Sequence, residues 1–306
     1  MSILLFFIDG LGLGQPDAKI NPLIKNMHFF NKTFGKHCFV NNGKLKEYKY
    51  GTVKGIDACL GVDGLPQSAT GQTALFTGIN AAKLLGYHLT AYPNTKLTKI
   101  IEEKSILKQL KDKNHKATSA NAYSDRYFSL VEEGQLGHSA STLTILAAGI
   151  PFRMIKDLKT GNAVFMDITN KYLKQYSYKG VKKIHPKTAA RNMNRIMNNH
   201  DFVLFEYWLT DYYGHLRGTK NDINRTLDNI DSFVEYIVRF MKEEHVVLIT
   251  SDHGNIENIS SKPHTKNPVP LAVFSKNNKA IDFFNSRIND ITHVAPAIIE
   301  YIENNN

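Results

Sequence analysis

The sequence predicts an α/β protein whose core is a mostly parallel sheet with helices on both faces. Two observations lead to this prediction. Short, continuous apolar runs occur at residues 3–8, 202–205, 246–250 and 271–274, and such runs are typical of buried strands. Amphipathic segments with helical spacing lie between them. Strands that alternate with helices favour a sheet covered on both sides.

Two segments have the clearest helical periodicity. Apolar residues recur at three- and four-residue steps over 222–244, where Asp222 is placed to cap a helix and Lys242 suits its last turn. Residues 95–111 show the same spacing. We therefore expect one helix in each segment.

The middle of the chain differs from both ends. Residues 116–186 are rich in Ser, Tyr and Gly, and their only strand-like run is 163–168. This change in pattern predicts a core formed by residues 1–115 and 187–306, with residues 116–186 inserted as a small cap domain.

The composition limits the function classes. Lysine and arginine outnumber acidic residues by 38 to 28, a net charge of +10, which suggests nucleic acid or an anionic substrate as partner. The lysines are scattered and no basic stripe with interleaved aromatics occurs, so nucleic acid is not expected. A non-catalytic protein that binds anions or nucleic acid remains the alternative from a different class.

The sequence also favours a cytoplasmic protein without a membrane partner. Cys38 and Cys59 are too few and too far apart for a disulfide framework or a CxxC site. The apolar run at 3–8 lacks the basic segment and cleavage site of a signal peptide. No window approaches the length of a membrane span.

Aspartate and histidine residues follow the predicted strands. Asp9, Asp211, Asp252 and His253 each come shortly after an apolar run, and the carboxyl ends of strands in an α/β sheet meet in one crevice. His215 lies four residues after Asp211. A single Asp in such a place is usually a turn residue. Six Asp and His residues, with His264 as the sixth, supply the ligands of two divalent cations, with Zn²⁺ and Mn²⁺ both plausible.

A hydroxyl-rich segment at 64–78 precedes an apolar helix. Ser68, Thr70 and Thr73 are its candidate nucleophiles. A hydroxyl at a helix start is often only a cap. The same position offers free amides to a phosphate, and a nearby metal would lower the pKa of the hydroxyl.

Glycines at 10, 12 and 14 raise the alternative of a dinucleotide-dependent oxidoreductase. The fingerprint G-x-G-x-x-G needs a third glycine, but its place is held by Gln15 or Asp17, depending on the starting glycine. Asp9 would also put a negative charge beside a pyrophosphate. This alternative is rejected.

Five motifs together resemble the alkaline phosphatase superfamily. They are Asp9-Gly10, the segment 68–78, Asp211-Tyr212-Tyr213-Gly214-His215, Asp252-His253-Gly254-Asn255 and the segment 264–270. They are most similar to the branch of cofactor-independent phosphoglycerate mutase and phosphopentomutase. The resemblance covers about 1–90 and 200–306, and it implies an alkaline-phosphatase-like core.

The resemblance implies roles for individual residues. Asp211, His215 and His264 are similar to the ligands of one metal. Asp9, Asp252 and His253 are similar to those of the other, which also touches the nucleophile. Counting the family's segment back from Thr77-Gly78 makes Ser68 the first choice for nucleophile, Thr70 the second and Thr73 the third. Mn²⁺ is the first choice of metal and Zn²⁺ the second.

The implied activity is metal-dependent phosphoryl transfer through a phosphoserine. The protein would be a phosphomonoester hydrolase or mutase acting on a small phosphorylated metabolite, with a phosphodiesterase of the same superfamily as the alternative. Gln72, which replaces a basic residue common in relatives, and Arg217 are candidate phosphate contacts. Other candidate basic groups are Arg126, Arg153, Arg191 and Arg195.

Overall fold

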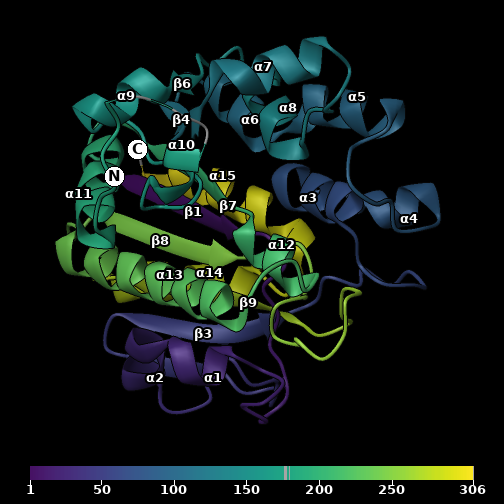
Figure 1. The fold of residues 1–306 in the computed structure, drawn as a ribbon, viewed down its shortest axis with the longest axis vertical. Coiled ribbons are helices and arrows are strands. Elements are labelled where there is room, and N and C mark those ends of the chain that lie inside the picture. The colour runs from purple at the N-terminus through teal and green to yellow at the C-terminus, as the bar shows by residue number, and fades with distance from the viewer. Residues whose placement is uncertain (176–177, 179, 306) are drawn as a thin grey trace.

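A seven-stranded sheet lies at the centre of the computed structural model, which describes residues 1–175, 178 and 180–305 (Figure 1). The strand order is β2-β3-β9-β8-β1-β7-β4. The four strands predicted for the core are present, in β1, β7, β8 and β9. The strands of this sheet are β1 (Ser2–Ile8), β2 (Lys46–Tyr48), β3 (Gly51–Ile56), β4 (Ala117–Ser119), β7 (Phe202–Tyr207), β8 (His245–Thr250) and β9 (Val269–Ser275).

Both faces of the sheet are covered, as predicted. Every residue of β1 is buried, and successive side chains enter opposite apolar clusters: Phe6 lies in one, and Phe7 lies in the other. The first cluster includes residues of α1 (Leu23–Asn26), α2 (His28–Phe34), α11 (Pro186–Met197), α12 (Leu209–Gly214) and α13 (Lys220–Phe240). The second includes residues of α3 (Ser68–Thr77), α4 (Ala81–Leu85), α5 (Thr95–Lys104), α6 (Ile106–Asp112), α8 (Ala140–Ala147), α14 (Asn278–Arg287), η1 (Ile291–His293) and α15 (Val294–Asn305).

Strand direction changes at β9. Strands β4, β7, β1 and β8 are parallel neighbours, whereas β9 is antiparallel to β8 and to β3, and β2 is antiparallel to β3. A parallel connection needs a crossover, usually a helix. The segment 251–268 between β8 and β9 contains no helix, so the chain turns back. As a result β9 begins at the edge of the sheet where β1, β7 and β8 end.

The two predicted helices differ from expectation at their ends. The segment 95–111 forms two helices, because Ser105 is extended with ψ of 146° and separates α5 from α6. Helix α13 begins after Thr219 and not after Asp222. The Thr219 side chain accepts a bond from Asp222 N, and the Asp222 carboxylate accepts one from Thr219 N. Lys242 lies beyond the C-cap residue, Met241.

The segment 116–186 is joined closely to the core. Strand β4 lies at the edge of the main sheet, and α8 packs against α3, α5 and α6. The predicted strand at 163–168 is wrong: its strand-like pairing is a bridge between Val164 and Asn121, and Ile168 has φ of +65°. The other elements are β5 (Ala122–Tyr123), β6 (Arg153–Met154), α7 (Asp125–Glu132), α9 (Ile155–Thr160) and α10 (Lys171–Gln175).

The boundaries of a separate cap domain stay a prediction. Residues 176, 177 and 179, within the predicted cap, lie outside the described residues. Among the helices described, none is both long and apolar enough to cross a membrane.

The capping box of α13 gives a test of the fold. We expect Thr219→Ala to lower the free energy of unfolding by about 1 kcal/mol, because the backbone N–H of Asp222, in the first turn of the helix, loses its acceptor. Thr219→Ser keeps the hydroxyl and is the control. Urea denaturation measures both variants, and equal stability of Thr219→Ala and wild type would contradict the assignment of the cap.

Candidate metal centre

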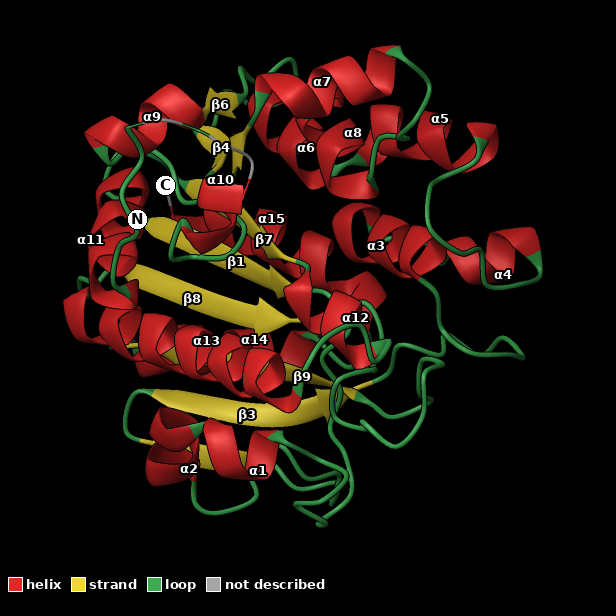
Figure 2. Cartoon of the chain, viewed as in Figure 1, coloured by secondary structure: helices red, strands yellow, loops and turns green. Residues whose placement is uncertain are grey.

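The six predicted metal ligands come together at one edge of the sheet. Figure 2 shows β1 and β8 pointing toward the side where α12 lies. Asp9 directly follows β1, α12 follows β7 and carries Asp211, and Asp252 comes two residues after β8. His264 precedes β9 and reaches the same edge because β9 runs in the opposite direction.

One potential metal-binding group consists of Asp9, Asp252 and His253. Their ligand atoms lie within 4.8 Å of one another, and all three residues are buried. The Nε2 atom of His253 is 3.4 Å from Asp9 Oδ1 and 3.5 Å from Asp252 Oδ2. This set matches one of the two triads that the resemblance implies.

The second group lies around Asp211. His264 Nε2 is 3.3 Å from Asp211 Oδ1, and His215 Nε2 is 3.4 Å from Asp211 Oδ2. The Nε2 atoms of His215 and His264 are 3.2 Å apart. The His264 ring stacks on the His253 ring with centroids 3.7 Å apart, and His253 also lies within 4.8 Å of the Asp211 and His264 ligand atoms. The two groups are therefore contiguous.

Backbone carbonyls orient two of the histidines. His215 Nδ1 is 2.9 Å from Lys262 O, and His264 Nδ1 is 2.8 Å from Pro66 O. A carbonyl can only accept, so Nδ1 carries the proton that is donated in both rings. Each Nε2 therefore faces the cluster, which is the usual arrangement of a metal-ligating histidine.

Burial and charge shift the pKa values of the cluster. Burial, together with the charges of Asp252 and Asp211, raises the pKa of Asp9 well above its usual range. Burial would also raise the pKa of Asp211, but bonds from His215 and His264 outweigh it and lower that pKa. Burial lowers the pKa of His253, so its neutral, metal-binding form is favoured.

These residues fit divalent cations. Among the described residues, Asp9 Oδ1 and His253 Nδ1 are buried without a hydrogen-bond partner. Asp9 Oδ1 faces into the cluster, 3.4 Å from His253 Nε2. A buried carboxylate without compensation is costly, and a cation supplies that compensation. The oxygen and nitrogen donors suit Mn²⁺ or Zn²⁺.

The structure separates the three candidate nucleophiles. Ser68 is the first residue of α3, is half-buried, and its Oγ lies 3.1 Å from His253 Nε2. Thr70 and Thr73 are fully buried. The Thr70 hydroxyl donates to Gln67 O, and the Thr73 hydroxyl donates to Ala69 O at 2.6 Å. Only Ser68, among these three, combines access with contact to the cluster.

Gln72 lies between the two buried carboxylates. Its Nε2 donates to Asp9 Oδ2 at 3.3 Å and to Asp252 Oδ2 at 3.1 Å. Gly71, one residue earlier, allows the close approach: a Cβ there would lie 2.8 Å from Asp252 O. The Gln72 amide is therefore engaged by two predicted metal ligands, and its predicted contact with a phosphate stays a prediction.

The candidate arginines make other contacts. Arg217 is exposed and its guanidinium lies 5.5 Å from the centre of the Tyr212 ring. Arg153 donates to Ser119 O, Arg195 donates to Thr160 O, and Arg191 lies over the Phe240 ring. Arg126 is an exposed residue of α7. Phosphate binding by any of these five residues stays a prediction.

Glu257 was not identified from the sequence, although its carboxylate accepts bonds from residues next to the cluster. It is fully buried and accepts bonds from Gly12 N, Asn255 N and Asn267 Nδ2. A Cβ at Gly12 would lie 2.3 Å from the Glu257 carboxylate, which explains why this position is glycine. Asn255, quoted in a motif but given no role, donates to Asp211 Oδ1 at 2.9 Å. An acidic residue just after the Asp252 motif was the available signal.

Glu206, another acidic residue, was not identified from the sequence either. It lies on β7 and accepts a bond from Ser141 Oγ. Burial raises its pKa to about 7, the bond from Ser141 opposes this rise, and the charge of Asp252 adds to it. The sequence feature that could have identified it is an acidic residue directly after the apolar run 202–205.

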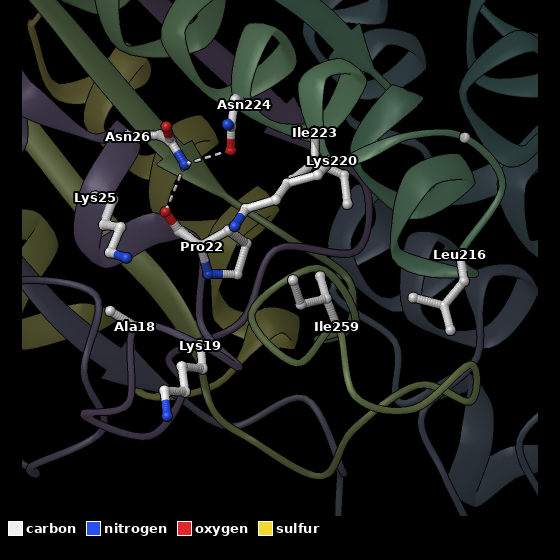
Figure 3. Close-up of a pocket in the computed structure, with 11 residues that line it drawn as sticks. Ala18, Lys19, Pro22, Lys25, Asn26, Leu216, Lys220, Ile223, Asn224 and Ile259 are labelled. Carbon is white, nitrogen blue, oxygen red and sulfur yellow. Dashed lines mark hydrogen bonds between the residues drawn. The ribbon is translucent and has the colours of Figure 1, made fainter.

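A separate cavity of about 340 Å³ opens beside Leu216 and Gly218, just after His215 in the chain (Figure 3). Lys19, Lys25 and Lys220 stand around it. No predicted metal ligand is among the described residues that line this cavity, so it is distinct from the cluster.

A family model described as the metalloenzyme superfamily matches residues 1–306. Part of the chain is 30% identical over 129 residues to a phosphopentomutase of Dictyoglomus thermophilum, covering 35% of this chain and 33% of that protein. Another match is 31% identical over 114 residues to a 2,3-bisphosphoglycerate-independent phosphoglycerate mutase of Ehrlichia canis, covering 35% and 22%. The matches span a third or less of the length of these curated relatives.

The fold is similar to that of a solved alkaline phosphatase. The enzyme from the Antarctic bacterium TAB5 aligns with a TM-score of 0.51 over 100% of this chain and 99% of that chain, at 13% identity. At this identity the likeness concerns the fold, and it confirms the predicted alkaline-phosphatase-like core.

Metal binding should stabilise the protein measurably. After removal of metals by a chelator, added Mn²⁺ or Zn²⁺ should raise the thermal midpoint, with about 2.7 kcal/mol of stabilisation at a hundred times the dissociation constant. The gain should shrink as the pH falls through the raised pKa of Asp9, because protons compete for the carboxylate.

Matched variants make this test specific. Asp252→Asn should lose most of the metal-dependent shift. Asp231→Asn should keep it, because Asp231 is also buried but accepts bonds from Phe29 N and Phe30 N, away from the cluster. An unchanged shift in Asp252→Asn would show that the metal binds elsewhere.

Proposed function

The chain belongs to the metalloenzyme superfamily, and from this premise we propose that it transfers a phosphoryl group of a small phosphorylated metabolite through a phosphoserine. The position of Ser68 carries the proposal. Its hydroxyl combines partial exposure with a distance of 3.1 Å to His253 Nε2, in the first turn of α3. A nucleophile needs both access to substrate and an activating group within reach.

We assign two divalent cations to the cluster, with Mn²⁺ as first choice and Zn²⁺ as second. Asp9, Asp252 and His253 would hold one, and Asp211, His215 and His264 would hold the other. When bound, such cations neutralise phosphate oxygens and favour the ionised form of a nearby hydroxyl. The buried, unpartnered Asp9 Oδ1 supports this assignment.

The transfer itself needs one bond made and one broken. The Ser68 Oγ forms a bond to phosphorus while the bond from phosphorus to the ester oxygen breaks, and the serine proton ends on the departing oxygen. The first amides of an α-helix have no partner within the helix. Those of Ala69 and Thr70 in α3 can therefore stabilise the phosphate on Ser68.

The second half of the cycle decides between hydrolase and mutase. Water as acceptor releases inorganic phosphate, whereas a second hydroxyl of the retained substrate gives an isomer. The segment 116–186 is our candidate for controlling the entry of water. Its helix α10 contacts α12, the helix that carries Asp211, because the hydroxyl of Tyr172 hydrogen-bonds that of Tyr213.

The nucleophile can be tested by trapping the phosphoenzyme. Metal-loaded protein incubated with ³²P-labelled phosphomonoesters should retain acid-stable label, and Ser68→Ala should remove it. Thr70→Val and Thr73→Val preserve side-chain shape and should keep the label. Label that survives in Ser68→Ala and disappears in either valine variant would move the role to that threonine.

The acceptor can be tested with a panel of phosphorylated metabolites, scored for both released phosphate and isomerised product. Chelator-treated protein should regain turnover with Mn²⁺ or Zn²⁺. Free phosphate as the main product identifies a hydrolase, and an isomer without free phosphate identifies a mutase. A lack of turnover with all substrates and with either metal would contradict the proposed function.

A further inference from the structure

Helix α12 presents exposed aromatic side chains beside the metal cluster. Trp208 and Tyr212 are 37% and 38% exposed. Residues at positions i, i+3, i+4 and i+7 of a helix share one face. This spacing is shared by Trp208, the N-cap residue with helical backbone angles, by Asp211 and Tyr212 within α12, and by His215, the C-cap residue. The two aromatic side chains therefore lie on the face of α12 that also carries two predicted metal ligands.

This face lies on the accessible side of the cluster. The side chains of Asp211 and His215 are 19% and 27% exposed, whereas those of Asp252 and His253 are fully buried. The cluster is therefore more exposed to solvent on the side of α12, which lies near the strand ends in Figure 1.

The exposure of these rings depends on their place on the helix. Tyr213, the next residue, faces away, is buried, and bonds to Tyr172. Trp208 and Tyr212 contact each other edge to face, with ring centroids 6.2 Å apart. Burial of such side chains releases free energy in proportion to the apolar area covered. Two adjacent exposed rings near the predicted metal ligands therefore favour a ligand that covers them.

A positive charge completes this surface. The Arg217 guanidinium lies 5.5 Å from the centre of the Tyr212 ring, a cation–π contact that holds it beside the aromatic pair. The surface thus combines flat apolar area with a cation, next to a cluster suited to bind phosphate. Such a combination fits a molecule that has both a ring and negative charge.

We propose that Trp208 and Tyr212 bind the organic part of the substrate, and that the substrate is a phosphomonoester whose organic part is a ring. The inference rests on the proposed function, because the metal cluster receives the phosphate. Aromatic rings and sugar rings both have a face that stacks on an aromatic side chain. The experiment distinguishes these two kinds of ring.

Trp208 makes a direct test possible, because it is the only tryptophan in the chain. Intrinsic fluorescence of metal-loaded Ser68→Ala protein is titrated with phenyl phosphate, ribose 5-phosphate and glycerol 3-phosphate. At least one ring compound should change the fluorescence and bind about tenfold more tightly than glycerol 3-phosphate, as expected for one stacked ring. Equal affinity for all three compounds, or no change in fluorescence at saturation, would overturn the proposal.

Variants extend the test to turnover. Trp208→Leu and Tyr212→Leu should raise KM for the preferred ring compound about tenfold, while kcat and the KM for glycerol 3-phosphate change less than about twofold. Tyr48→Leu removes an exposed tyrosine on β2, the outermost strand of the sheet, and is the control. Equal effects on ring and ringless substrates would show a merely structural role and overturn the assignment.

The two proposals fail in different ways. If no phosphomonoester is turned over and Ser68 is never labelled, the proposed function fails. The fluorescence titration then still decides whether the aromatic surface binds rings. If turnover occurs without any preference for rings, only the inference about Trp208 and Tyr212 is lost.

Discussion

The burial of like charges at the edge of the sheet is the constraint on which the site depends. Asp9 and Asp252 are both buried, and they lie close enough to share one amide donor, Gln72. Carboxylates removed from water repel each other strongly, so their neighbours must compensate. The backbone amide of Gly10 adds to this compensation by donating to Asp252 Oδ1. A cation supplies what these neutral groups leave uncompensated.

The reversal of β9 brings the second half of the site into place. In an all-parallel sheet, the residues just before a strand lie at the edge opposite to the ends of the other strands. Because β9 runs against β8, His264 reaches the same edge as Asp211. The loop that makes this turn also carries Lys262, whose carbonyl orients His215, and Thr265, which bonds to Glu257. One change of direction thus supplies a predicted ligand and two supporting contacts.

Four strands and the clustering of six Asp and His residues were predictable from the sequence because each has a local signature, whereas β2, β3 and β4 were not predicted. Buried strands appear as apolar runs, and Asp9 follows such a run directly, whereas Asp252 comes two residues after one. Features decided by tertiary contacts were not predictable. The apolar spacing is helical throughout 95–111, yet the extended backbone of Ser105 divides this segment into two helices. The direction of β9 depends on a long loop. The role of Glu257 depends on amides from distant residues. The choice of Ser68 over Thr70 required the resemblance, since both hydroxyls belong to one segment.

Gln72 has a consequence for the charge of the site. Its neutral amide donates to both Asp9 and Asp252. A side chain with a permanent positive charge at this position would offset the charge of one carboxylate, whereas the amide leaves both charges in place. The attraction of the site for cations therefore depends on residue 72 as well as on the acidic side chains themselves.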